Sequence, residues 1–531
     1  MLLALFSAPL LAALATVFAS GKDGDAAFRL SFFFACTVAL LGLSLIIAPA
    51  SYWPPISIPW FTLWGTGATV HLSLASDGLS GWLVQLVTWL TPLALLGSRK
   101  AMGERMRDFA VAVLVMEALM IGALLARDLV VFYFCYEGML VPMLVLIALL
   151  GGTERRSAAL WFFLYTMLGS VFMLVGIWFL AWKMGSTDLA TLVAGIGSMR
   201  ELTATFSVID FELFGQQWRF FQATPMGLLF LGFLLAFAVK VPLVPLHSWQ
   251  EITYAEAPAG AVVLLAGAMA KIGVYGLARI VLPLFPVEVA AAANTIMVLG
   301  LIGVVGGAFI ALAQDDVKRM LAWSSLSHLS LVVIGLFSLA PAALAGVPVQ
   351  MVAHGLSVAA IFLLAGYLEQ RAMACGLDDF GGLADRMPVF AVLFVVAALA
   401  SAGLPGTANF AGEFLLLLGT WQSFGPLVTA LAGLSVILSA VYLLRVVQRW
   451  LYGSRPAHLD RLEDLGPGEA LAVVPLLIVT ILFGFYPAPI TSQAGPVMES
   501  LAAPARAAHA AAAVSPLAQP TPAAARSEPV K

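Results

Sequence analysis

The chain has 531 residues and a formal net charge of −3; 62% of its residues are hydrophobic and only 10% are charged. A soluble domain needs a far larger polar surface, so the composition excludes a soluble enzyme and predicts an all-α protein that crosses a membrane many times. Three widely spaced cysteines, Cys36, Cys135 and Cys375, argue against an iron–sulfur cluster, a structural zinc site and a disulfide framework.

Apolar runs long enough to cross a bilayer recur along the chain. A membrane-spanning helix needs about 20 apolar residues, and on that criterion we expect about fourteen such helices. The first run resembles the core of a signal peptide but has no basic segment before it, so we expect a retained helix. The expected helices cover residues 2–20, 29–49, 79–97, 109–126, 129–149, 158–182, 225–248, 258–282, 289–313, 319–339, 343–367, 387–421, 427–451 and 469–490.

The basic residues between these runs predict the orientation. If the N-terminus lies outside, the inward loops carry sixteen Lys and Arg residues and the outward loops carry five. Because cytoplasmic loops are enriched in Lys and Arg, this bias predicts a multi-pass protein of the bacterial inner membrane with both termini on the periplasmic side.

Lys240 lies inside the seventh apolar run, where a lysine costs roughly 2.5–3.5 kcal/mol to insert. Pro242 and Pro245 follow it and remove two backbone donors, so we expect the helix to break beside the charge. The twelfth run is too long for one span and contains Gly-Leu-Pro-Gly at 403–406, which predicts a second broken helix. A charge beside a broken membrane helix is typical of sites that move ions.

Six ionisable side chains fall inside the predicted helices and form a candidate proton relay. Buried acids, lysines and imidazoles can hold or pass a proton, and serines beside broken backbone can order water between them. Serines at 324, 325, 327 and 330 surround the first of two histidines. The six relay residues are Glu137, Lys240, Lys271, His328, His354 and Glu413.

Structural roles compete with this interpretation. One buried Glu–Lys pair can be a packing lock, but six such residues on six helices are harder to explain in that way. A lone membrane histidine is more often a helix contact than a relay, and ligation of a b-type haem by His328 and His354 is a minor alternative. Arg127 and Asp128 are expected to form a charge pair at the membrane surface.

The order of these features indicates an internal duplication. Helices four to eight and helices nine to thirteen each contain one broken helix, as in the inverted repeats of transporters. We also expect a polar, aromatic-bearing loop over 186–224. The expected regions are N-terminal helices over 1–108, the first five-helix repeat over 109–282, the second over 289–451, a loop with helix fourteen over 452–501, and a disordered Ala/Pro-rich tail over 502–531.

Four segments within about residues 80–490 carry a family resemblance. They resemble the antiporter-like proton-pumping subunits of respiratory complex I, a family that three subunits of this NADH:quinone oxidoreductase share with subunits of multisubunit Na⁺/H⁺ antiporters. Two features resemble one of the three subunits more than the others. Position 413 is a glutamate where relatives usually have lysine, and the chain ends soon after helix fourteen. The segments are FYFCYEGMLVPM, AFAVKVPLVPLHSWQEITYAEAPAGAVVLLAGAMAKIGVYGLARI, DDVKRMLAWSSLSHLSLVVIG and GLPGTANFAGEFLLL.

The resemblance implies a role for each relay residue. Glu137 and Lys240 would form a coupled pair, Lys271 the central relay and Glu413 the terminal site, with both histidines between Lys271 and Glu413. Weakening the pair would pass the Lys240 proton on to Lys271. The implied protein is a subunit of a translocase with no cofactor on this chain. Its partners are membrane-arm subunits on both sides, lipids, protons and ordered water, with no nucleic acid.

Other classes of function make different predictions. A subunit of a multisubunit Na⁺/H⁺ antiporter would depend on sodium and have no link to NADH oxidation. A stand-alone transporter would be active by itself, whereas a structural scaffold would tolerate Lys240→Ala with full activity.

Overall fold

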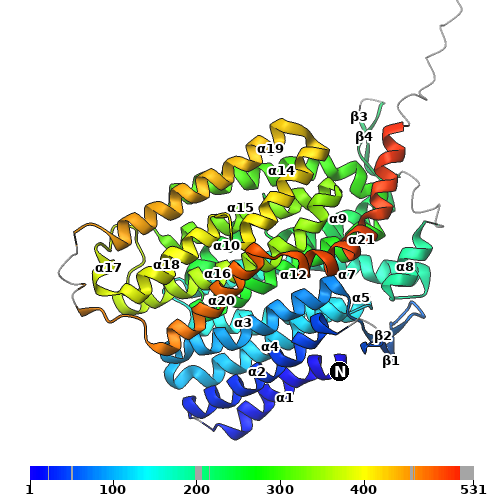
Figure 1. Cartoon of the computed structure of the whole chain (residues 1–531). Coiled ribbons are helices and arrows are strands. Elements are labelled where there is room, and N and C mark those ends of the chain that lie inside the picture. Colours follow the sequence, from blue (N-terminus) through cyan, green and yellow to red (C-terminus); the bar gives the residue numbers. More distant parts are fainter. Residues whose placement is uncertain are drawn as a thin grey trace, which may run out of the picture.

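The computed structural model describes residues 1–21, 23–48, 52–197, 206–213, 216–454, 459 and 461–514. Most of these residues lie in helices that run along one another in a single bundle (Figure 1). Long apolar sequences account for this, because inside a membrane each helix satisfies its own backbone hydrogen bonds. The prediction of an all-α membrane architecture is confirmed.

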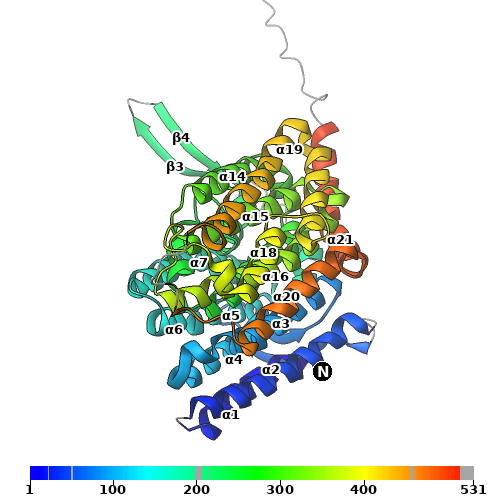
Figure 2. The same ribbon diagram turned by 60° about the vertical axis from the view of Figure 1, so that its left-hand side comes forward.

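In the first part of the chain, α1 and α2 lie at the outer edge of the bundle (Figure 2). Asp77, Asp128 and Asp188 start α3, α5 and α8, and their carboxylates accept backbone N–H groups of the first turns. The elements are α1 (Leu2–Ala19), α2 (Gly24–Ile47), α3 (Gly78–Met102), η2 (Gly103–Arg105), α4 (Met106–Leu125), α5 (Leu129–Gly138), α6 (Leu140–Leu150), α7 (Arg155–Met184) and α8 (Leu189–Ile196).

In the second part, α16 and the continuous stretch from α11 to α13 are buried along their apolar length and form the centre of the bundle. Helix α19 bends at Gly425, which has a φ of +82°, before Pro426. The elements are α9 (Pro225–Lys240), α10 (Ser248–Glu256), α11 (Ala259–Leu264), η4 (Leu265–Met269), α12 (Ala270–Gly276), η5 (Leu277–Val281), α13 (Leu282–Leu284), α14 (Pro286–Leu312), α15 (Val317–Ser338), α16 (Pro341–Ala372), α17 (Leu383–Arg386), α18 (Pro388–Ser401), α19 (Ala408–Leu451), α20 (Pro467–Phe485) and α21 (Ala488–Val514).

Two antiparallel hairpins lie at the same end of the bundle, which we call the hairpin end (Figure 1). They are β1 (Ile56–Thr62) with β2 (Thr69–Leu74), and β3 (Phe206–Leu213) with β4 (Gln216–Ala223). The expected loop over 186–224 is therefore wrong as a description: it contains α8 and the second hairpin, while 198–205, 214 and 215 lie outside the described residues.

Within the described ranges, eleven helical stretches are long and apolar enough to cross a membrane, and one of them, Gly78–Leu125, contains both α3 and α4. Helices α9 and α18 are shorter apolar helices. Both expected helix breaks are present, because α9 ends at Lys240 and α18 ends at Ser401. The count of fourteen spans and the two inverted repeats stay predictions.

The expected disordered tail over 502–531 begins too early. Helix α21 continues to Val514, and its side chains Met498, Ala502 and Ala505 are buried. Alanine is the strongest helix former and its small side chain permits close packing, so an alanine-rich segment favours a helix where it meets the bundle. Residues 515–531 lie outside the part of the chain that the structure describes.

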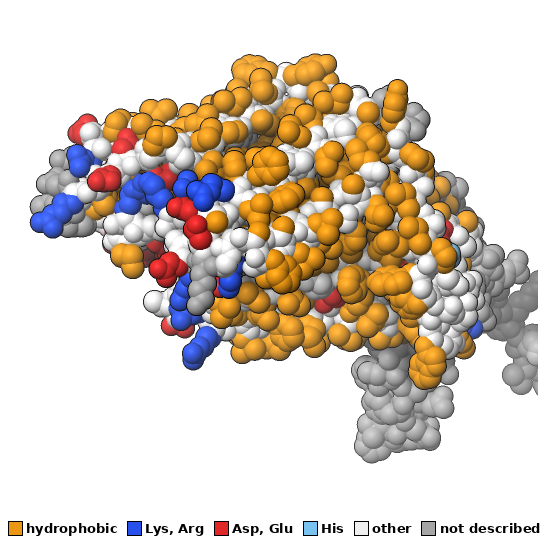
Figure 3. Space-filling model, turned by 90° about the horizontal axis from the view of Figure 1, so that it is seen from below, with side chains coloured by type: hydrophobic (Ala, Val, Ile, Leu, Met, Phe, Trp, Pro, Cys, Tyr) orange, Lys and Arg blue, Asp and Glu red, His pale blue; other side chains and the backbone are white. Residues whose placement is uncertain are grey.

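Charged side chains are distributed unevenly over the surface. On the face shown in Figure 3, most of the surface is hydrophobic, and Lys, Arg, Asp and Glu gather mainly at the end opposite the hairpins. We call this the charged end. Met1 and the end of α21 both lie at the hairpin end (Figure 1).

Candidate functional site

Lys271 lies in the fully buried central stretch, and its side chain is 1% exposed. The α-helical segment that carries it lies between two π-helical turns, η4 and η5, which often mark functional positions. Its Nζ donates to the Ala266 carbonyl in η4 at 2.5 Å and lies 2.7 Å from Nδ1 of His354 on α16. A hydrogen bond between two nitrogens holds one proton, so this pair carries at most one positive charge.

His354 continues the row toward α15 and α19. Its ring centroid is 5.7 Å from that of His328, and Nδ1 of His328 lies 2.9 Å from Oε1 of Glu413. Gln350 Nε2 also donates to this Glu413 oxygen, at 3.3 Å. The structure therefore brings Lys271, His354, His328 and Glu413 together in one row, with both histidines between the lysine and the acid, although the four residues come from four different helices.

A small polar cavity adjoins the two histidines. Its volume is about 10 Å³, and a cavity of about this size holds one water molecule. His328 Nε2, Ser325 Oγ and Asn409 Oδ1 are buried and make no hydrogen bond to any described group, so they are available to bind such a water. The polar lining consists of Ser324, Ser325, His328, His354, Ser357, Ser401 and Asn409.

The break before α19 makes room for Glu413. Between α18 and α19, Gly403 has a φ of +75°, and a Cβ there would lie 2.5 Å from Glu413 Oε2. That oxygen is buried and has no hydrogen-bond partner among the described residues. Glu413 thus has one oxygen in the row and one directed at the broken backbone.

Lys240 and Glu137 form a separate, looser group. Lys240 is 1% exposed, donates to the Tyr136 carbonyl at 2.8 Å, and places Nζ 3.3 Å from the centre of the Tyr136 ring. Glu137 interacts electrostatically with Lys240, but the two form no ion pair within the described structure. Glu137 Oε1 is buried without a described hydrogen-bond partner. The predicted pair is therefore adjacent but not closed.

The helices that carry Lys240 and Lys271 pack tightly against each other. A Cβ on Gly273 of α12 would lie 2.9 Å from Val241 Cγ2 and 3.1 Å from the Phe237 carbonyl oxygen. The two lysines thus lie on contacting helices, although within the described residues their side chains bond to other groups.

Sequence reasoning missed several polar residues. Gln350 and Asn409 contact relay residues or line the cavity, and both are buried. Glu117 in α4 is 0% exposed and was passed over, although a lone acid inside an apolar run was a visible signal. No group of three or more His, Cys, Asp or Glu in the described residues could hold a metal ion.

The fold and the buried row of ionisable side chains define a polytopic membrane protein built around titratable side chains. The chain belongs to the family described as NADH:quinone oxidoreductase/Mrp antiporter, transmembrane, whose model matches residues 126–439.

Individual relatives agree with the family resemblance. NADH-quinone oxidoreductase subunit M of Rhodobacter capsulatus is 37% identical over 433 residues, which are 81% of this chain and 82% of that one. A chain of respiratory complex I from Thermus thermophilus superimposes with a TM-score of 0.82 at 30% identity, covering 95% of this chain and 100% of that one. A chain of the Mrp complex from Dietzia sp. DQ12-45-1b has a TM-score of 0.80 at 19% identity, covering 96% and 98%, and so shares the fold.

Proposed function

We propose that this chain is a proton-translocating membrane subunit of an NADH:quinone oxidoreductase. Redox chemistry on partner subunits would drive protons through the relay. The observation that carries the proposal is the row of contacts from Lys271 through His354 and His328 to Glu413. Burying such a row costs stability, which favours a transport role over a packing lock.

In the proposed path, Lys271 shares one proton with His354 across their 2.7 Å contact. The 5.7 Å between the two imidazole centroids is bridged by one water in the polar cavity. His328 then exchanges the proton with Glu413 across 2.9 Å. Each transfer is short, so small side-chain movements suffice once the proton affinities change.

Lys240 serves as the gate of the path. In the described state its ammonium is held by the carbonyl and ring of Tyr136 rather than by Glu137. Movement of Lys240 toward Glu137 would stabilise its charge, and movement away would favour release of a proton toward Lys271. Water would have to bridge the two lysines.

The energy needed is modest. Moving one charge against 100 mV costs about 2.3 kcal/mol. A hundredfold change in the relative proton affinities of two groups is worth about 2.7 kcal/mol. One opening of the Glu137–Lys240 pair per cycle is therefore enough, provided that neighbouring membrane subunits deliver it.

The charged end supports one orientation of the chain in the membrane. Basic residues accumulate on the cytoplasmic side of membrane proteins, so we place the charged end in the cytoplasm and both termini in the periplasm. Tags at both termini should be accessible from the periplasmic side, and termini on opposite sides would refute this placement.

The test is NADH-driven proton uptake into inverted membrane vesicles that carry Lys271→Met. The variant keeps an unbranched side chain only one atom shorter but cannot carry a proton, so uptake should fall about tenfold or more. Lys318→Met is the matched control, since Lys318 is also buried but pairs with Glu369 at 2.9 Å outside the relay.

Normal uptake in an assembled Lys271→Met complex would refute the proposed function. Uptake that requires sodium and is independent of NADH would instead favour the cation/proton antiporter. Equal losses in the Lys271 and Lys318 variants would point to a general structural effect and count against a specific relay.

A further inference from the structure

Another buried ionisable side chain, Glu117, lies outside the relay. Glu117 is in the middle of α4, is 0% exposed, and neither of its carboxyl oxygens has a hydrogen-bond partner among the described residues. An unpaired carboxylate in such a place is costly, whereas a neutral carboxylic acid is tolerated. The surroundings therefore favour an acid that holds its proton at rest.

A hydroxyl on the neighbouring helix lies beside Glu117. Thr91 of α3 interacts with Glu117, and its Oγ1 donates its own proton to the Val87 carbonyl at 3.0 Å. Because this proton is used in the bond to Val87, the Thr91 oxygen is left as an acceptor next to Glu117, although no hydrogen bond joins the two side chains in the described structure. Pro92 follows directly and has no N–H, which leaves the Thr88 carbonyl without its usual helical donor and adds an acceptor at the same level.

Helix α3 has two different sides. Leu86 and Leu90 face the relay, because a Cβ on Gly355 or Gly267 would meet their side chains at 2.8 and 2.7 Å. The buried polar residues Gln85, Thr88 and Thr91 are on another side, at helical spacing of three. An apolar layer thus separates Glu117 and these polar residues from the relay.

The polar side of α3 runs toward a cavity at the hairpin end. Gly42 of α2 packs against this polar side, since a Cβ on Gly42 would lie 2.9 Å from Thr88 Oγ1 and 3.0 Å from Gln85 Oε1. Gln85 Oε1 is itself buried without a described partner. About two turns further toward the start of α3 is a cavity of about 350 Å³, whose polar lining includes Ser76, Asp77 and Gln493.

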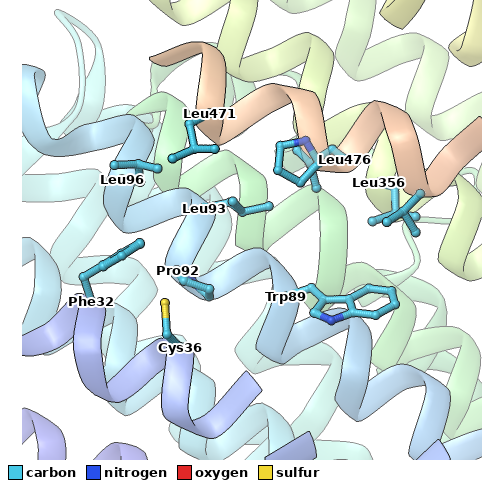
Figure 4. Close-up of a pocket in the computed structure, with 11 residues that line it drawn as sticks. Phe32, Cys36, Trp89, Pro92, Leu93, Leu96, Leu356, Leu471 and Leu476 are labelled. Atoms are coloured by element: carbon cyan, nitrogen blue, oxygen red, sulfur yellow. The ribbon is translucent and has the colours of Figure 1, made fainter. Parts of the chain in front are cut away.

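The side that faces the membrane is closed to water by apolar residues. Cys36, which interacts with Glu117, points toward Pro92 in a groove between α2, α3 and α20 (Figure 4). The groove is lined by apolar side chains that include Trp89 and Leu93. A proton that reaches Glu117 therefore comes along α3 rather than from the lipid side.

We propose that Glu117 is a proton-binding site that takes part in proton translocation in addition to the relay. It would exchange its proton with the cavity at the hairpin end along Thr91, Thr88 and Gln85. In each exchange the O–H bond of the acid breaks, the proton passes to water beside Thr91, and a carboxylate remains until a proton returns. The inference rests on the proposed function, because the site is expected to load and empty only while partner subunits turn over.

The experiment measures proton uptake and NADH oxidation in inverted vesicles containing the whole complex. Glu117→Gln has the shape of the neutral acid and should assemble, yet it should lower the protons moved per NADH at least twofold. Thr91→Val keeps the shape of threonine without the hydroxyl and should lower proton uptake in the same direction. Glu104→Gln changes an exposed acid of η2 and serves as the control without effect.

The outcomes separate this inference from the proposed function. Normal protons per NADH in Glu117→Gln, together with loss in Lys271→Met, would overturn the inference alone. Normal values in both variants would overturn both. If Glu117→Gln does not assemble, Thr91→Val decides, since normal coupling in that variant would remove the path on which the site depends.

Discussion

The two parts of the relay differ in how firmly their residues hold one another. Lys271, His354, His328 and Glu413 form a closed part, with polar contacts of 2.7 and 2.9 Å at its two ends. Glu137 and Lys240 form an open part, in which the lysine is held by Tyr136 and the acid has an unpaired oxygen.

The difference assigns different tasks to the two parts. A closed row can pass a proton with little movement, so its residues should act as one unit. In the open part, the Lys240 ammonium has two alternative partners, Tyr136 and Glu137. A switch requires two such alternative states. Changes in the open part should therefore stop the cycle, whereas conservative changes in the closed part should slow it.

The largest effect is expected in the open part. Lys240→Ala or Glu137→Gln removes one state of the switch, so proton uptake should fall by about tenfold or more, and NADH oxidation should fall with it. Assembly should survive, because each variant makes its helix less charged. An assembled variant that pumps at the wild-type rate would remove the switch from the account.

Glu413 distinguishes a titratable site from a structural one in the closed part. Glu413→Ala leaves His328 without its carboxylate and should reduce uptake strongly, while Glu413→Asp keeps a titratable group and partial uptake. Glu413→Lys tests whether the charge sign matters. Glu413→Gln keeps an acceptor oxygen without a titratable group, so normal pumping in this variant would mean that Glu413 only supports the break before α19.

A change at the contact between the helices of Lys240 and Lys271 should have an intermediate effect on proton uptake. Gly273→Ala would place a methyl group against Val241 and the Phe237 carbonyl, and overpacking of this kind costs about 1–3 kcal/mol. Thermal unfolding of the complex should begin earlier, and proton uptake should fall while Lys240 and Lys271 are intact. Gly306→Ala in α14 meets nothing within 4 Å and is the matched control; equal behaviour of the two variants would argue against a tight junction.

The smallest effect on pumping is expected from a change at Asp77. At the hairpin end this residue forms ion pairs with Arg127, before α5, and with Arg279, after α12. Burial raises the pKa of this carboxyl, but Arg279 beside α12 and Arg127 before α5 outweigh it and lower the pKa to about 2. The difference from an unfolded pKa near 3.9 corresponds to about 3 kcal/mol of stability.

Because the folded pKa is the lower one, this stability is fully present above about pH 4 and is lost as the pH falls toward 2. Asp77→Asn keeps the cap of α3 and removes the charge, so it should lower the midpoint of thermal unfolding at pH 7 by an amount that shrinks below pH 4. A constant difference from pH 7 to pH 3 would contradict the assigned ion pairs.

The sequence predicted the breaks of the fold better than its contacts. Pro242, Pro245 and the Gly-Leu-Pro-Gly segment act locally on the backbone, so the ends of α9 and α18 could be located without a structure. Both histidines were expected between Lys271 and Glu413, but the sequence did not say which of them contacts the lysine. That contact and its distance depend on how four helices are rotated, which apolar composition does not record.

The errors have separate causes. Arg127 was expected to pair with its neighbour Asp128, but it pairs with Asp77, while Asp128 caps α5 and accepts from Thr187. The hairpins were missed because the search for long apolar runs ignores short strands. Glu117 was missed although, like Lys271, it is an ionisable residue inside an apolar run.

His354 provides the most direct test, since the closed part depends on this residue to join Lys271 to His328. His354→Leu removes both contacts without adding a charge. The measurement is NADH-driven proton uptake into inverted vesicles containing equal amounts of assembled complex. We predict that uptake falls about tenfold or more. Uptake at the wild-type rate would contradict the relay, because no imidazole would then join the central lysine to the terminal acid.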